Sequence, residues 1–307
     1  MLGVALAVAL GLTAASDRDL SYDLGSPPPV AAHNLLDVYS PGGARRGSRP
    51  VVVWVHGGGW QQGDKRDGIR RKARLLTRAG YVLASVNHRL SGVAPPSGPF
   101  DPGRVRFPDH PRDVAEAVAW LHRRVARFGG DPRRMVLMGH SSGAHVAALV
   151  ATDPRYLRRH GVPRRVIRGV VSLDTAALDV RPLADPGSSE GARGIWSVFG
   201  TPAENAVTGA WAAASPLLQA DRGDPPFLQL LGATASAGKR RQSREMARAL
   251  GQSTRSVLRL SLDHVAIERL LGVNRRETRA VLSFLARATR RARDRSPAPG
   301  GSSAARR

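Results

Sequence analysis

The chain has 307 residues, of which 42% are hydrophobic, and a mean hydropathy of −0.25. This is enough apolar material for a full core, which excludes a chain disordered throughout. The first stretch alone is apolar enough to enter a membrane, which excludes a polytopic membrane protein. No cysteine occurs, which excludes disulfides, a cysteine nucleophile and thiolate metal ligands. One large domain with tails fits the length as well as two domains.

The chain is strongly basic, with 47 Lys and Arg against 24 Asp and Glu and a formal net charge of +23. Only three of the 47 are lysines, and the arginines are scattered through the predicted helices. Aromatic residues make up 5%, too few for obvious base-stacking platforms. We therefore expect no specific nucleic-acid partner, and a weak attraction to anionic surfaces that fades with salt.

The two ends of the chain differ from its middle. Residues 1–16 contain an apolar run the length of a signal-peptide core, too short for a stable membrane span, which predicts export to the cell envelope or beyond. No positive charge precedes the run. The alternatives are an N-terminal helix packed on the domain, or a misassigned start codon, and a cytoplasmic location. Residues 292–307 lack apolar side chains and predict a disordered basic tail, which leaves 34–291 as the domain.

Hydrophobic patterning predicts an alternation of strands and helices. Strands are expected at 35–39, 51–55, 81–87, 135–138, 166–173, 227–231 and 256–262, and helices at 69–79, 111–128, 143–152, 240–250 and 276–291. This order indicates an α/β fold, with a mostly parallel sheet and helices on both faces. Residues 174–226 interrupt the alternation and are too many for a plain connection, so we expect a lid-like insertion of short helices before the penultimate strand.

Gly139-His140-Ser141-Ser142-Gly143 lies between a predicted strand and a predicted helix. G-x-S-x-G in this position holds the serine on a strained turn, near the N–H groups that begin the helix. The motif predicts Ser141 as the nucleophile and the N–H of Ser142 as an oxyanion donor. The alternative is a tight turn of small residues without chemistry.

A second glycine-rich loop, His56-Gly57-Gly58-Gly59-Trp60, follows the strand VVVWV. Three glycines after a buried strand suit N–H groups that turn toward a substrate oxygen, so we expect Gly58 and Gly59 to complete the oxyanion hole. The alternative is a flexible turn. His56 is expected to be structural, and Trp60 to form a wall of the substrate pocket.

HGGGW after one strand and GHSSGAH after another resemble the α/β-hydrolase fold, within it the esterase/lipase group related to hormone-sensitive lipase and kynurenine formamidase-like enzymes. The similarity extends from about Leu35 to Leu285. It implies a serine esterase fold with Ser141 as nucleophile and a histidine after the last strand as general base. His264 lies at that position, whereas His110, His122 and His160 are expected at the surface, and His140 and His145 are expected to support the elbow.

The acid of the triad is the difficulty. The resemblance places it shortly after the strand PPFLQLL, but no carboxylate follows until Glu245, inside a predicted helix. Asp174, at the end of the preceding strand, is our first candidate and Asp179 the second. Asp263 is disfavoured, because adjacent side chains in an extended segment point opposite ways. An enzyme that has lost its acid is the other interpretation.

Together these features predict a serine carboxylic-ester hydrolase that acts on a small or medium acyl ester through an acyl-enzyme. We expect Trp196, Phe199 and Trp211 of the insertion to line the substrate pocket, and no metal or organic cofactor to be needed. An amide or formamide hydrolase on the same site is one alternative. A non-catalytic binding protein with this fold is the other, because the usual acid position is empty.

Overall fold

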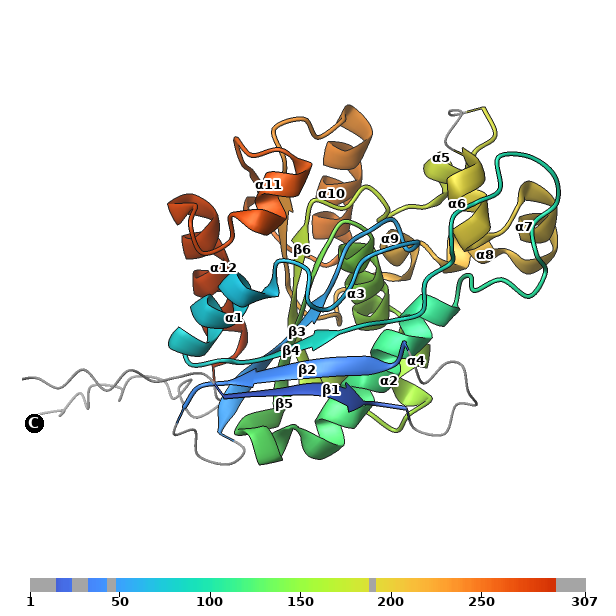
Figure 1. Ribbon diagram of the computed structural model, residues 1–307. Helices are drawn as coiled ribbons and strands as arrows, with labels where there is room; N and C mark the ends of the chain where they lie inside the picture. Colours follow the sequence, from blue (N-terminus) through green and yellow to red (C-terminus); the bar gives the residue numbers. More distant parts are fainter. Residues whose placement is uncertain (1–14, 24–32, 43–47, 188–191, 291–307) are drawn as a thin grey trace, which may run out of the picture.

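An eight-stranded sheet runs through the molecule in the order β1-β2-β4-β3-β5-β6-β7-β8 (Figure 1). The computed structural model describes residues 15–23, 33–42, 48–187 and 192–290. The strands are β1 (Ala15–Ser21), β2 (Leu35–Ser40), β3 (Arg49–Val55), β4 (Val82–Val86), β5 (Gly130–His140), β6 (Ile167–Leu173), β7 (Phe227–Leu231) and β8 (Val257–Arg259). The β1–β2 and β2–β4 pairs are antiparallel and all others are parallel, so the predicted mostly parallel sheet is confirmed.

Both faces of the sheet are buried, which explains the unbroken apolar runs of its central strands. In β3, Val53 and Val55 belong to one hydrophobic cluster, and Val52 and Trp54 belong to the other. This is the two-residue period of a pleated strand. One cluster packs under α2 (Asp109–Arg124), α3 (Ser142–Thr152), α4 (Pro154–Arg158) and α10 (Ala237–Ala249), and the other under α1 (Ile69–Arg78), α11 (His264–Arg269) and α12 (Arg275–Ala288).

The segment between β6 and β7 contains the short helices predicted for it. They are α5 (Arg181–Ala184), α6 (Ala192–Phe199), α7 (Pro202–Thr208), α8 (Ala210–Ala213) and α9 (Pro216–Gln219). Thr201 and Glu204 begin α7 with a capping box, in which each side chain accepts from the other's backbone N–H. Helices α5 to α8 gather in a lobe at one side of the molecule (Figure 1). The lid function of this segment stays a prediction.

Several boundaries differ from those predicted. Strand β1 was not expected, β5 is longer than its apolar stretch, and β8 is shorter. The helix expected at 111–128 is α-helical to Arg124 and then tightens into the 3-10 turn η2 (Val125–Phe128), which ends at Gly129 with φ 84°. The basic tail and all but the last two residues of the predicted signal peptide lie outside the described residues. Within the described ranges, no helix is both long and apolar enough to cross a membrane.

Candidate active site

Three side chains from separate elements meet at the carboxyl ends of β5 and β6. His264 Nε2 lies 3.0 Å from Ser141 Oγ, and His264 Nδ1 lies 2.6 Å from Asp174 Oδ2. Both distances are within hydrogen-bonding range. Asp174 is 2% exposed, whereas the His264 side chain is 44% exposed, so the imidazole is accessible and its acid partner is shielded. The geometry is that of a Ser-His-Asp triad.

The turn at Ser141 depends on both glycines of the motif. Ser141 has φ 53° and ψ −120°, a strained conformation, and its N–H donates to Leu173 O at 2.8 Å. A Cβ on Gly139 would lie 2.4 Å from Gly143 O, and a Cβ on Gly143 would lie 2.2 Å from His56 O. Since neither backbone can move away without displacing a central strand, only glycine fits at these two positions.

The glycine-rich loop after β3 lies beside the elbow, since a Cβ on Gly57 would lie 3.4 Å from the Ser141 Cβ. Gly58 has φ 119° and Gly59 has φ 63°, and a Cβ on Gly58 would lie 2.0 Å from Gln62 O. Within the described part of the chain, neither the Gly58 nor the Gly59 N–H donates a hydrogen bond. These two N–H groups and that of Ser142, at the start of α3, are therefore available to an anionic oxygen.

Asp174 is supported by the loop in which the resemblance places the acid and by the helix α10 that follows it. The Gly232 N–H, directly after β7, donates to Asp174 Oδ1 at 2.8 Å, and Lys239 Nζ lies 3.1 Å from Oδ2. Burial alone would raise the pKa of Asp174. The hydrogen bonds from His264 and Gly232 and the Lys239 charge outweigh burial and hold this pKa below its usual range. Sequence reasoning missed Lys239, whose only signal is a lysine at the beginning of α10.

A polar network holds the segment that carries His264. His140 Nε2 donates to the backbone oxygen of His264 at 2.8 Å, and the two rings are 4.5 Å apart. On its other side His140 Nδ1 lies 3.2 Å from Glu268, which also pairs with Lys72 at 3.1 Å. Burial would raise the pKa of Glu268, but the hydrogen bond from His140 and the Lys72 charge lower it to about 2. The Glu268 carboxylate therefore stays ionised and anchors His140.

His145 connects the elbow helix α3 to two other segments. Its Nδ1 accepts from Trp60 Nε1 at 3.1 Å, and its Nε2 donates to Ala214 O in the insertion at 2.8 Å. Burial lowers the pKa of His145 to about 4, which keeps the ring neutral in the tautomer that these bonds need. Trp60 and Phe199 are 7% and 2% exposed and pack edge to face.

Trp196 and Trp211 are partly buried in the insertion. Trp196 Nε1 donates to Ala184 O at 2.8 Å, and Trp211 Nε1 donates to Gly200 O at 3.0 Å. Trp196 lines a cavity of about 340 Å³, together with Phe100 and Glu204. The role of these side chains in substrate binding stays a prediction.

The remaining histidines correct one expectation. His110 was expected at the surface but is 1% exposed, with Nε2 2.9 Å from Ser91 Oγ, and burial lowers its pKa to about 3. The His110 ring meets the His88 ring edge to face at 5.7 Å, and His88 in turn stacks on His56. His110 is buried because it contacts Ser91 and His88, which come from another part of the chain. The arginine-rich local sequence does not indicate these contacts. His122 and His160 are half-buried.

The other two acidic residues considered for the triad, Asp179 and Asp263, form contacts elsewhere. Asp179 pairs with Arg181 at 2.8 Å and accepts from Ser215 at 3.2 Å. Asp263 caps α11 by accepting from the Ala266 N–H at 2.7 Å. Among the described residues, no group of three or more His, Asp or Glu side chains is placed to hold a metal ion.

The sheet order, the elbow and the triad geometry define a protein of the α/β-hydrolase fold. Solved structures of this fold include a truncated carbohydrate esterase from gut microbiota, which has a TM-score of 0.67 at 17% identity over 90% of this chain and 96% of that one. Esterase B of Lactobacillus rhamnosis has a TM-score of 0.65 at 20% identity over 90% and 85%. The BD-FAE family model matches residues 36–250, more than half of the chain, and the chain belongs to that family.

A curated relative is esterase LipQ of Mycobacterium tuberculosis, which is 29% identical over 89% of this chain. The chain spans 62% of that esterase's length. The family model and this relative confirm the resemblance to the esterase/lipase group of α/β-hydrolases.

Proposed function

We propose that the protein is a serine carboxylic-ester hydrolase. The observation that carries this proposal is the position of His264, whose two ring nitrogens lie 3.0 Å from Ser141 Oγ and 2.6 Å from Asp174 Oδ2. The alternative of a non-catalytic binding protein depended on the absence of a carboxylate directly after β7. Asp174 supplies a carboxylate from the end of β6 instead, which removes the main support for that alternative.

In the proposed reaction, His264 Nε2 takes the proton of Ser141 as Oγ attacks the acyl carbonyl. The imidazolium that forms is stabilised by Asp174, to which Nδ1–H donates. The N–H groups of Gly58, Gly59 and Ser142 hold the oxyanion of the tetrahedral intermediate. His264 then protonates the departing alcohol, and water releases the acid from the acyl-enzyme by the same steps in reverse order.

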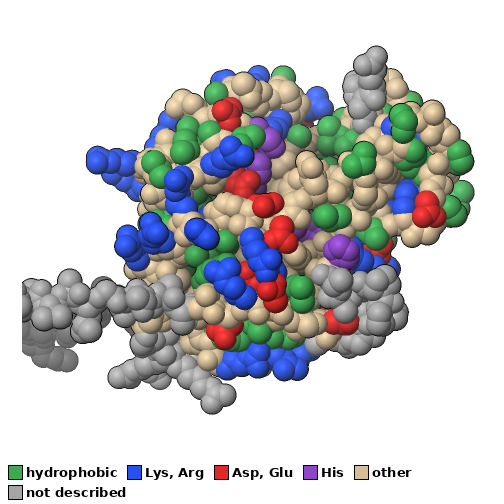
Figure 2. Space-filling view, viewed as in Figure 1, with side chains coloured by type: hydrophobic (Ala, Val, Ile, Leu, Met, Phe, Trp, Pro, Cys, Tyr) green, Lys and Arg blue, Asp and Glu red, His purple; other side chains and the backbone are tan. Residues whose placement is uncertain are grey.

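The proposed substrate is an ester of a small or medium acyl group. Relatives named as esterases, LipQ among them, support an ester as the substrate. Phe199 of the insertion packs edge to face on Trp60 of the glycine-rich loop and on His145 of α3, and Figure 2 shows hydrophobic side chains over the lobe of α5 to α8. We propose that Trp60, Trp196, Phe199 and Trp211 shape the acyl pocket.

Labelling with a fluorophosphonate tests the proposal, because only an activated serine reacts. We expect labelling of the protein and none of Ser141→Ala. In a p-nitrophenyl ester assay, Ser141→Ala should lose at least about 10⁴ in turnover. Ser142→Ala should lose far less, since His264 contacts the Ser141 hydroxyl, whereas the Ser142 hydroxyl is buried and has no hydrogen-bond partner among the described residues.

Equal losses in the two variants would contradict the assignment of the nucleophile. An unlabelled protein would support the non-catalytic alternative. A parallel series with matched p-nitroanilides separates an esterase from an amide hydrolase on the same residues.

A further inference from the structure

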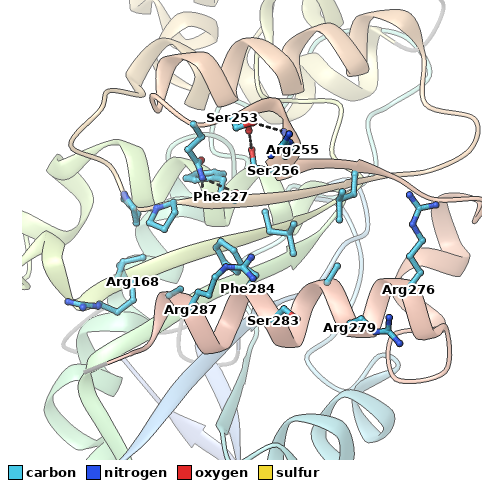
Figure 3. A pocket seen from close by; sticks show the side chains of 18 of the residues that line it. Arg168, Phe227, Ser253, Arg255, Ser256, Arg276, Arg279, Ser283, Phe284 and Arg287 are labelled. Carbon is cyan, nitrogen blue, oxygen red and sulfur yellow. Dashed lines mark hydrogen bonds between the residues drawn. The ribbon is translucent and has the colours of Figure 1, made fainter. Parts of the chain in front are cut away.

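A cavity of about 1240 Å³ opens between α12 and the amino ends of β6, β7 and β8 (Figure 3). It begins where β6 and β7 begin, at Ile167 and Phe227. Ser141, Asp174 and His264 lie at the opposite edge of the sheet, and the seven residues of β6 separate the two edges by about 20 Å. The cavity shares no residue with the triad or the oxyanion loop.

The sequence of α12 explains why space remains here. Arg276, Ala280, Ser283 and Arg287 recur at three or four residues and therefore lie along one face of the helix, which lines the cavity. Ala280 and Ser283 are small side chains, so this face of the helix leaves space beside the strands. Further along the helix, Phe284 closes the gap by packing on Gly169, where a Cβ would lie 2.9 Å from the phenyl ring.

The floor of the cavity is apolar, and its rim is cationic. The partly buried side chains of Leu258, Ala280 and Ala288 form its open surface, over Ile167, Phe227, Leu228 and Phe284, which are buried.

Eight arginines and no Asp or Glu line the cavity. Arg164 is neutralised by Asp224 at 2.7 Å and Asp221 at 3.1 Å, whereas none of the other seven forms an ion pair with a described residue. Figure 3 shows Arg168 and Arg287 toward one end and Arg276 and Arg279 toward the other, with Ser283 and Phe284 between them.

Like charges gathered in this way repel one another, and an anion offsets that repulsion. Covering the apolar floor between the arginines with hydrocarbon removes apolar surface from water, which is favourable. Along α12 the positions of Arg276 and Arg287 are about 16 Å apart at 1.5 Å per residue, a distance that suits an extended alkyl chain of medium length. Figure 2 shows that Lys and Arg side chains also gather on the outer surface over α1 and α12.

We propose that this cavity binds a single-chain anionic amphiphile of the fatty-carboxylate class. Its hydrocarbon chain covers Leu258, Ala280 and Ala288, and its carboxylate accepts hydrogen bonds from guanidinium groups at one end of the cavity. The site is independent of the proposed ester hydrolysis, because it lies at the other edge of the sheet.

Calorimetric titration of the full chain with decanoate, below its critical micelle concentration, tests the proposal. We expect one binding site whose affinity falls with salt. Binding of 1-decanol and of butyrate should be at least about tenfold weaker, since 1-decanol lacks the carboxylate and butyrate lacks the long hydrocarbon chain.

Three variants test the position of the site. Ala280→Trp should fill the cavity and abolish decanoate binding, with thermal unfolding used to verify the fold. Arg276→Ser/Arg279→Ser changes exposed residues only and should weaken binding about tenfold. Arg244→Ser, an exposed arginine of α10 outside the cavity, should bind as the unchanged chain does.

Three results would overturn the proposal. One is decanoate binding that survives both the Ala280→Trp and the double arginine substitutions, which would place the ligand elsewhere, including at the triad. Another is equal binding of decanoate and 1-decanol. The last is a single-stranded DNA oligonucleotide or a phosphatidylglycerol vesicle that binds Ala280→Trp as tightly as the unchanged chain while decanoate does not compete, which would show a surface attraction for polyanions only.

Discussion

Asp174 has a left-handed backbone conformation, with φ 54°, directly after the last residue of β6. Its N–H donates to Leu230 O at 2.8 Å, and this bond to the neighbouring strand holds the strained residue. The conformation turns the carboxylate toward the Gly232 N–H and His264. In the proposed mechanism Asp174 performs the task that the resemblance assigns to the loop after β7, and Gly232 of that loop donates a hydrogen bond to it.

Replacing this carboxylate by an amide should preserve the fold and remove the stabilisation of the imidazolium. We expect Asp174→Asn to lower turnover by up to about 10⁴, or roughly 5 kcal/mol. Asp179→Asn, which loses a partner of Arg181 and Ser215, should lower turnover far less. The measurement is kcat for a p-nitrophenyl ester together with circular dichroism. Similar kcat values for the two variants would exclude Asp174 as the orienting acid.

At the scale of the element, the elbow depends on the close approach of α3 to β3. Gly143→Ala places a Cβ 2.2 Å from His56 O and 2.3 Å from Val55 O. We expect this variant to lose at least about 3 kcal/mol of unfolding free energy, because neither contact is a flexible side chain. Its activity should also fall, because the glycine-rich loop moves with His56.

The matched control is Gly238→Ala, where the nearest atom to the new Cβ is 3.8 Å away and φ is not positive. Urea denaturation compares the two variants. If both unfold at the same urea concentration, the close packing of α3 on β3 is not required.

The insertion is the second element with a defined expectation. If α6 and α8 contribute to the acyl pocket, Trp196→Ala and Trp211→Ala should shift the preference among p-nitrophenyl esters toward longer chains, because each removes a large side chain. Val207→Ala is a suitable control, since Val207 lies in the same segment and is 88% exposed. An unchanged ratio of kcat/KM between butyrate and decanoate esters in both tryptophan variants would mean that these side chains only pack the insertion.

At the scale of the whole molecule, we expect one buried acid to make stability depend on pH. Glu277, on the inner face of α12, is fully buried, and neither carboxylate oxygen has a hydrogen-bond partner among the described residues. Burial raises its pKa from 4.5 to about 8, although the Lys72 charge offsets part of the effect. As pH rises from about 4.5 to 8, the unfolded chain releases this proton and the folded chain retains it, so the free energy of unfolding falls across that interval.

Glu277→Gln removes the titrating group and should flatten this part of the pH profile. Relative to the unchanged chain, its unfolding free energy should rise between pH 4.5 and 8 by up to about 4 kcal/mol. Urea denaturation at several pH values measures the effect. Glu245→Gln, at a half-exposed position of α10, should show no such trend. A stability difference that is the same at all pH values would show that Glu277 does not titrate in this interval.

The sequence by itself determined the central strands, the elbow and the oxyanion loop. Their signals are local, since β-branched runs, a serine between glycines and three successive glycines each depend on residues within about six positions of one another. The sequence also named Ser141, His264 and Asp174, but it left Asp174 beside Asp179 and beside the alternative of a lost acid.

Only the tertiary structure decided which carboxylate faces His264, because that contact joins residues 90 positions apart. The structure likewise decided the role of Lys239, the burial of His110 and the presence of β1. Strand β1 lies at the edge of the sheet, and its Asp19 pairs with Lys65. Its sequence therefore lacks the alternation of apolar residues by which a strand is predicted. The arginines around the distal cavity come from η3 (Arg164–Val166), β6, η4 (Thr254–Ser256) and α12. In the sequence they are a diffuse charge, and they become a site only when folding brings those elements together.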